Sequence, residues 1–132
     1  MRYYDETRMA RLREAVDATV TKWPKVTRKL MFGCPCYKAG GRLFAFLVTN
    51  GIVLTRLSPE DRATAGSRFK AKPFNTGTRA MGGWPQLPLA RVARLKGYLP
   101  FVRRSYNSAL AASREPARPA KRKPLSRSRV ME

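Results

Sequence analysis

One stretch of the sequence constrains the fold more than any other, because residues 42–57 place two apolar runs on either side of Asn50-Gly51. An Asn-Gly pair between strand-like runs predicts a two-residue type I′ turn, since Asn and Gly tolerate positive φ better than other residues. We therefore predict an antiparallel hairpin here. Both faces of its first strand are apolar, which predicts a central strand. Alternation puts three large side chains on one face of that strand: Phe44, Phe46 and Val48.

The flanking segments predict three helices and further strands. Asp5 is expected to cap an amphipathic helix over residues 5–20, and Ser58 to cap a shorter helix that ends near residue 66. A third helix is predicted over residues 90–112, kinked or interrupted at Pro100. The other strands are predicted at residues 26–37 with a break or bulge at 33–35, at residues 69–74, and at residues 84–88, where two prolines favour a sheet edge.

This order predicts an α+β fold of the form α-β(3)-α-β(2)-α, with a mainly antiparallel five-stranded sheet covered by helices. The 132 residues suit one domain and a tail. Residues 1–113 are assigned to the domain. Residues 114–132 are rich in Arg, Lys, Pro and Ser and nearly devoid of apolar side chains, so they are predicted to be a disordered basic tail.

Charge is the strongest indication of a partner. The chain has 28 Lys and Arg residues against 8 Asp and Glu, a net charge of +20. Such an excess favours a polyanionic partner, because phosphate contacts by many cations give affinity without sequence readout. We find no helix-turn-helix, zinc-finger or RNP motif, so a specific base code is not expected. No leader-like or membrane-spanning apolar run is apparent, which predicts a cytoplasmic protein without a membrane partner.

The leading hypothesis is therefore non-sequence-specific binding of DNA, RNA or nucleoprotein through phosphates. The alternative is a regulatory module that binds a protein, and a homodimer through an exposed edge at residues 84–88 stays open. The residues predicted to contact nucleic acid are Arg28, Lys29, Lys38, Arg42, Lys70, Lys72, Arg91, Arg94, Arg103, Arg104, Lys121, Arg122 and Lys123.

The chain offers little for catalysis or metal binding. It has no His and only two Cys, Cys34 and Cys36. A closed zinc site needs four ligands, so we predict no metal. Because the usual acid/base side chain is missing, we also predict no catalytic residue, and we predict no cofactor. The thiols have two interpretations: apolar fillers, or reactive groups whose pKa nearby cations lower. A small-molecule pocket between the sheet and a helix is a further alternative to plain core packing, lined by Met31, Phe32, Gly33, Cys34, Cys36 and Tyr37.

Four local patterns occur together: Met31-Phe32-Gly33, the hairpin at residues 43–57, Trp84 at the start of a late strand, and Ser105-Tyr106-Asn107-Ser108-Ala109-Leu110 near the end of the last helix. In this order and spacing, residues 5–112 resemble the amino-terminal domain of TfoX, the bacterial competence regulator, and related YjbR-like small α+β domains. The resemblance implies a two-layer α+β fold and a non-enzymatic regulatory or binding role. Full-length TfoX has a second, helical domain, in whose place this sequence has the basic tail.

Overall fold

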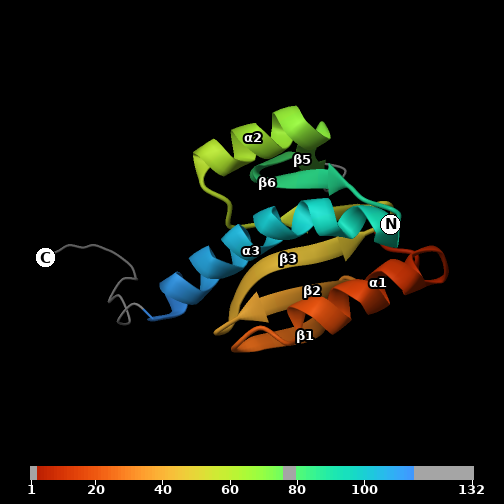
Figure 1. Ribbon diagram of the computed structural model, residues 1–132, viewed down its shortest axis with the longest axis horizontal. Helices are drawn as coiled ribbons and strands as arrows, with labels where there is room; N and C mark the ends of the chain where they lie inside the picture. The colour runs from red at the N-terminus through yellow and green to blue at the C-terminus, as the bar shows by residue number, and fades with distance from the viewer. Residues whose placement is uncertain (1–2, 76–79, 115–132) are drawn as a thin grey trace, which may run out of the picture.

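The computed structural model describes residues 3–75 and 80–114, with only the backbone of residues 80–82 and 114. These residues form an α+β fold of three helices and one antiparallel sheet of six strands (Figure 1). The sheet order is β1-β2-β3-β4-β6-β5. In chain order the elements are α1 (Glu6–Val20), β1 (Val26–Met31), β2 (Cys34–Ala39), β3 (Arg42–Val48), β4 (Gly51–Leu54), α2 (Pro59–Phe69), β5 (Lys72–Asn75), β6 (Ala80–Pro88) and α3 (Val92–Arg114).

The sixth strand comes from the segment that was predicted to be one broken strand. Val26–Met31 and Cys34–Ala39 pair with each other as β1 and β2, with Met31 opposite Cys34. The two residues between them, Phe32 and Gly33, have φ of 54° and 78°. Two successive positive φ values make a tight hairpin turn, so the chain reverses where we expected a bulge, and the five-stranded prediction is wrong.

The central hairpin is confirmed, with its turn one residue earlier than predicted. Val48 pairs with Gly51, so the turn residues are Thr49 and Asn50, and Asn50 has φ 58°. Gly51 is the first residue of β4. A Cβ atom there would lie 3.2 Å from the Leu87 carbonyl oxygen, so the glycine allows β6 to approach β4 closely.

The predicted edge at residues 84–88 is wrong, because β6 lies inside the sheet between β4 and β5. Leu87 pairs with Ile52 of β4, and Pro85 lies opposite Pro73 of β5 at an irregularity in the register. Each proline lacks an N–H donor, and the interrupted ladder is where that loss is tolerated. The edge at which a homodimer was left open is therefore covered by β5.

The helix starts follow the sequence more closely than the helix ends. Asp5 caps α1, and the Ser58 side chain accepts a 3.1 Å hydrogen bond from the Asp61 backbone N–H at the start of α2. However, α2 continues past residue 66 to Phe69, so the strand predicted from residue 69 begins only at Lys72. Phe69 packs on α3, and this tertiary contact extends the helix. The third helix is unbroken at Pro100.

Two faces of the sheet have different environments. Helices α1 and α3 lie on one of them, named here the helix face (Figure 1). Tyr37 points to this face and donates a 2.6 Å hydrogen bond to Asp17 of α1. The opposite face, named the open face, carries Cys34, Cys36 and Phe46, since Cys36 pairs with Phe46 across β2 and β3.

A bulge in β3 interrupts the alternation of side chains that we predicted for this strand. Tyr37 pairs with Ala45, and Lys38 pairs with Leu43, which leaves Phe44 as an extra residue. After a bulge the side chains change face. Phe44 therefore contacts Tyr106 of α3 on the helix face, with ring centroids 5.5 Å apart, whereas Phe46 lies on the open face. The prediction that both rings share one face is wrong.

Candidate functional sites: an apolar pocket and a cationic groove

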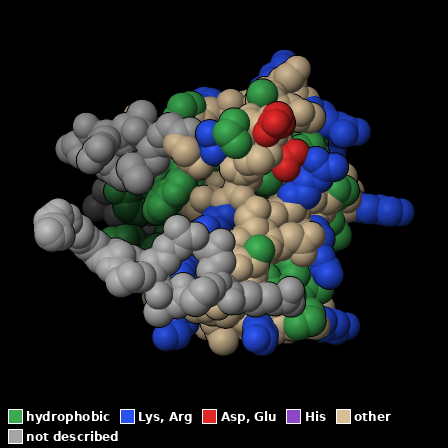
Figure 2. All heavy atoms as spheres, turned by 90° about the vertical axis from the view of Figure 1, so that its left-hand side faces the viewer, with side chains coloured by type: hydrophobic (Ala, Val, Ile, Leu, Met, Phe, Trp, Pro, Cys, Tyr) green, Lys and Arg blue, Asp and Glu red, His purple; other side chains and the backbone are tan. Residues whose placement is uncertain are grey.

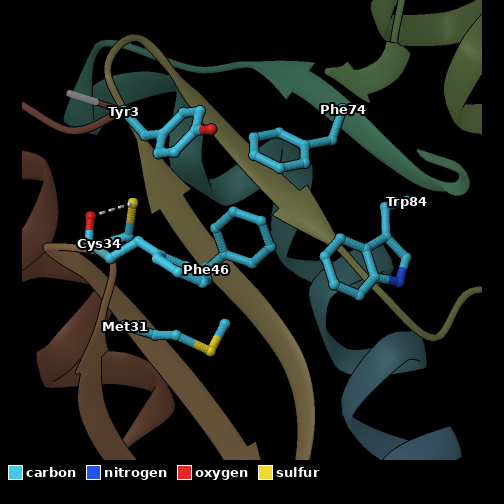
Figure 3. Close-up of a pocket in the computed structure, with 7 residues that line it drawn as sticks. Tyr3, Met31, Cys34, Phe46, Phe74 and Trp84 are labelled. Atoms are coloured by element: carbon cyan, nitrogen blue, oxygen red, sulfur yellow. Dashed lines mark hydrogen bonds between the residues drawn. The ribbon is translucent and has the colours of Figure 1, made fainter. Parts of the chain in front are cut away.

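An apolar pocket of about 260 Å³ lies on the open face (Figure 3). It forms because the sheet curls. Phe46 of β3 and Phe74 of β5 have ring centroids 5.1 Å apart, although β4 and β6 lie between their strands. A flat sheet would separate those strands by roughly 14 Å. The curl closes a space lined by Tyr3, Met31, Phe32, Cys34, Phe46, Phe74 and Trp84.

The aromatic rings of the pocket meet mainly at their edges. The Phe46 ring is 88° from the Phe74 ring and 73° from the Trp84 ring, with Phe46 and Trp84 centroids 5.8 Å apart. Edge-to-face contacts of this kind are favourable, and they hold the rings at steep angles that leave space between them. Figure 3 shows Tyr3, Phe74 and Trp84 arranged around Phe46, with the Met31 side chain below it. Among the residues that the structure describes, none of the lining side chains is charged.

The two thiols belong to the packed wall of the open face. Cys34 and Cys36 are 2% and 1% exposed, and neither forms a disulfide. Burial raises the pKa of Cys34, and burial with the neighbouring Cys34 thiol raises the pKa of Cys36 to about 11. The charge of Lys38 lowers the pKa of Cys36, as expected of a nearby cation, but desolvation outweighs it and the net shift is upward. The structure favours the interpretation of these cysteines as apolar fillers.

Half of the predicted pocket residues line this pocket, and the pocket lies on the opposite side of the sheet from the one expected. Met31, Phe32 and Cys34 contribute to it. Gly33, Cys36 and Tyr37 are not part of its lining, and Tyr37 faces α1 instead. Sequence reasoning missed four lining residues that are distant in the chain. Their aromatic character was visible, but nothing local indicated that the sheet curls to bring them together: Tyr3, Phe46, Phe74 and Trp84.

A second feature is a groove between the end of α2 and the start of α3, named here the cationic groove. Arg68, Lys70 and Arg94 line it, and none of the described residues in its lining is acidic. Its floor includes Phe69 and Tyr98, whose rings stack with centroids 4.3 Å apart and planes 22° apart. Lys70 sits at the left-handed C-cap of α2, which turns the chain at the groove. The structure thus brings together two predicted contact residues and adds Arg68.

Three other predicted contact residues already have partners within the fold. Arg28 Nε lies 3.2 Å from the Asp17 carboxylate, and Arg104 lies 2.6 Å from Asp61. Arg103 stacks over the Trp23 ring, with its guanidinium carbon 4.7 Å from the ring centroid. These interactions hold helices in place, so the three arginines are less available to an external phosphate.

The remaining predicted cations are scattered. Figure 2 shows Lys and Arg side chains reaching outward at several separate places around the molecule. Lys38 is half-buried in β2. The exposed ones are Lys29, Arg42, Lys72 and Arg91. The last three predicted residues, Lys121, Arg122 and Lys123, lie outside the described residues, as does the predicted tail from residue 115 onward.

Comparison of the chain with protein-family models, with curated proteins and with solved structures found no match. Within residues 3–75 and 80–114, the helices are all too short or too polar to cross a membrane.

Proposed function

We propose that this chain is a non-enzymatic, TfoX-amino-terminal-like binding domain that associates with nucleic acid or nucleoprotein through phosphates, with the cationic groove as its main contact in the folded domain. The observation that carries this proposal is the convergence of Arg68, Lys70 and Arg94 on one groove, where the described residues of the lining include no carboxylate. The acidic residues of the described chain belong to α1, its cap and the first turn of α2.

The groove has the chemistry that phosphate recognition requires. A guanidinium group presents parallel N–H donors that match two phosphate oxygens, whereas a lysine supplies a point charge. The groove contains two guanidinium groups, of Arg68 and Arg94, and one lysine, Lys70. The start of α3 adds the positive end of a helix dipole nearby. Binding through these groups reads backbone charge and leaves base sequence unread.

The test is a salt titration of binding to unrelated DNA and RNA duplexes, followed by fluorescence anisotropy, with the full chain. We expect binding at about 50 mM salt that weakens linearly on a logarithmic scale as salt rises. The variant Arg68→Gln/Lys70→Gln/Arg94→Gln should lower the slope by about 2 to 3, since each lost phosphate contact contributes about 0.9.

A matched control removes the same charge elsewhere. Arg8, Arg11 and Lys22 are exposed, lie on α1 or directly after it, and are not part of the groove lining. Their triple Gln variant should change the slope by less than one contact. Equal losses in the two variants would show that only net charge matters, and absence of binding at about 50 mM salt would refute the proposal. A third variant, Lys121→Gln/Arg122→Gln/Lys123→Gln, measures the contribution of the tail.

A further inference from the structure

The open-face pocket is built for an uncharged guest. Its lining offers aromatic rings and the sulfur atoms of Met31 and Cys34, and no side chain of the lining that the structure describes carries a charge. A charged ligand would lose its hydration there without gaining an ionic partner, which is costly. The rings of Phe46, Phe74 and Trp84 present edges and faces at steep angles, a geometry that suits a flat aromatic molecule.

The size of the pocket limits the guest further. An apolar cavity of roughly 150 Å³ accommodates benzene. The pocket here measures about 260 Å³, which by the same ratio holds about ten non-hydrogen atoms. That is the size of two fused rings and is too small for a helix or strand of a protein partner, since a helix with its side chains is about 10 Å across.

Phe32 gives an independent indication of binding. Its side chain is 81% exposed, although it is large and apolar, and it borders the pocket. Its φ of 54° is a conformation that aromatic residues rarely adopt, in a turn where Asn before Gly33 would be favoured. An exposed ring in an unfavourable backbone conformation at the rim of an apolar pocket has no evident role in stability.

We propose that the open-face pocket binds a neutral bicyclic aromatic molecule, and that Phe32 covers the bound molecule. The Phe32 ring becomes buried when the pocket is filled. The free energy gained by burying the ring then offsets the cost of its positive φ, and this happens only in the bound state. This proposal concerns a different part of the molecule from the cationic groove and does not depend on nucleic-acid binding.

The experiment uses indole as the probe and the full chain with ¹³C-labelled methionine methyl groups. Met31 lines the pocket, whereas Met9 is a buried residue of α1 that does not line the pocket and serves as an internal reference. Indole should shift the Met31 methyl resonance with saturation at submillimolar concentration and leave Met9 unmoved. Indole-3-acetate, which adds a carboxylate, should bind at least about ten-fold more weakly.

Two variants separate binding from folding. Phe32→Asn creates the favoured Asn-Gly turn, so we expect an unchanged or higher melting temperature together with indole binding weakened by about three-fold or more. Leu30→Asn is the matched control, because Leu30 is also an exposed apolar residue of the same hairpin, 68% exposed, and does not line the pocket. Its affinity for indole should equal that of the unmodified chain.

Several results would overturn the proposal. They are the absence of a saturable Met31 shift up to the solubility of indole, equal affinity for indole and indole-3-acetate, and indole affinity unchanged by Phe32→Asn. A lower melting temperature for Phe32→Asn would instead give Phe32 a structural role. If another segment of the chain fills the pocket, indole will not bind, and the proposal fails by the first of these criteria.

Discussion

The helix face and the open face are built from alternate residues of the same strands, yet they are packed in different ways. On the helix face, the rings of Trp23, Phe44 and Tyr106 form a cluster, with Trp23 and Tyr106 centroids 5.0 Å apart. Hydrogen bonds join this cluster to the backbone: Ser105 donates to the Phe44 carbonyl at 2.6 Å, and Tyr106 donates to the Pro24 carbonyl at 2.8 Å.

On the open face, none of the described helices lines the pocket around Phe46, and the side chains are brought together by the curl of the sheet instead. Phe46 meets Phe74 and Trp84 edge to face, and these rings border a pocket of about 260 Å³. The difference indicates that one face of each central strand is filled by packed side chains, while the other face borders the pocket for which we propose a ligand. Measurements on matched residues from the two faces can test this division.

The largest effect is expected at the paired phenylalanines of β3. Phe44 and Phe46 are 0% and 4% exposed, so burial alone predicts similar costs for replacing either by Ala. We expect Phe44→Ala to lower the free energy of unfolding by about 3 to 5 kcal/mol. Phe46→Ala should cost about 1 kcal/mol less, because the Phe46 ring already borders a void. Urea denaturation measures both. An equal or larger loss at Phe46 would contradict the division.

The next effect concerns thiol reactivity on the open face. Burial raises the pKa of Cys36 to about 11 from an ordinary value of 9.0, so near pH 8 the thiolate fraction falls about 100-fold. We expect Cys36 to react with iodoacetamide at least about 100-fold more slowly in the folded chain than in urea, as followed by mass spectrometry. Labelling of the folded chain at the rate of the unfolded one would restore the reactive-thiol hypothesis.

A smaller effect on stability is expected at Tyr37, which follows Cys36 in β2 and points to the helix face. Its hydroxyl donates to Asp17, and burial together with this hydrogen bond raises the pKa of Tyr37. Tyr37→Phe should lower the free energy of unfolding by about 1 to 2 kcal/mol, since Asp17 retains its contacts with Arg13 and Arg28. Chemical denaturation checks this value, and no change would show that the hydroxyl does not hold α1 to the sheet.

The smallest effect is at Glu6, beside the helix face. A hydrogen bond from Tyr4 lowers the pKa of Glu6 below its ordinary 4.5. The ionised carboxylate therefore stabilises the fold above pH 4.5, and this stabilisation is lost as pH falls through the lowered pKa. Because the side chain is 53% exposed, Glu6→Gln should cost only a few tenths of a kcal/mol at pH 7.

The test of the Glu6 prediction is urea denaturation at pH 7 and at about pH 3. The difference between Glu6→Gln and the unmodified chain should shrink at the lower pH. In the background of Tyr4→Phe the pH dependence of this difference should be weaker, because the hydrogen bond with the largest influence is gone. A difference that grows on acidification would have the wrong sign for this explanation.

The sequence predicted features that depend on neighbouring residues. The caps at Asp5 and Ser58 and the central hairpin are confirmed, because capping and turn formation depend on contacts within a few positions. The turn at Phe32-Gly33 was missed because Phe is an unusual residue at positive φ. The extension of α2 to Phe69 was missed because its cause is packing on α3.

The sequence by itself determined the α+β class, the order of the three helices and the central hairpin, and the excess of positive charge. Only the tertiary structure decided that β6 lies inside the sheet, that a bulge sends Phe44 and Phe46 to opposite faces, and which cations share a groove. The physical reason is the range of the interactions. Turns and caps form between close neighbours in the chain, whereas the pocket needs Tyr3, Phe46 and Trp84 to meet through a curled sheet.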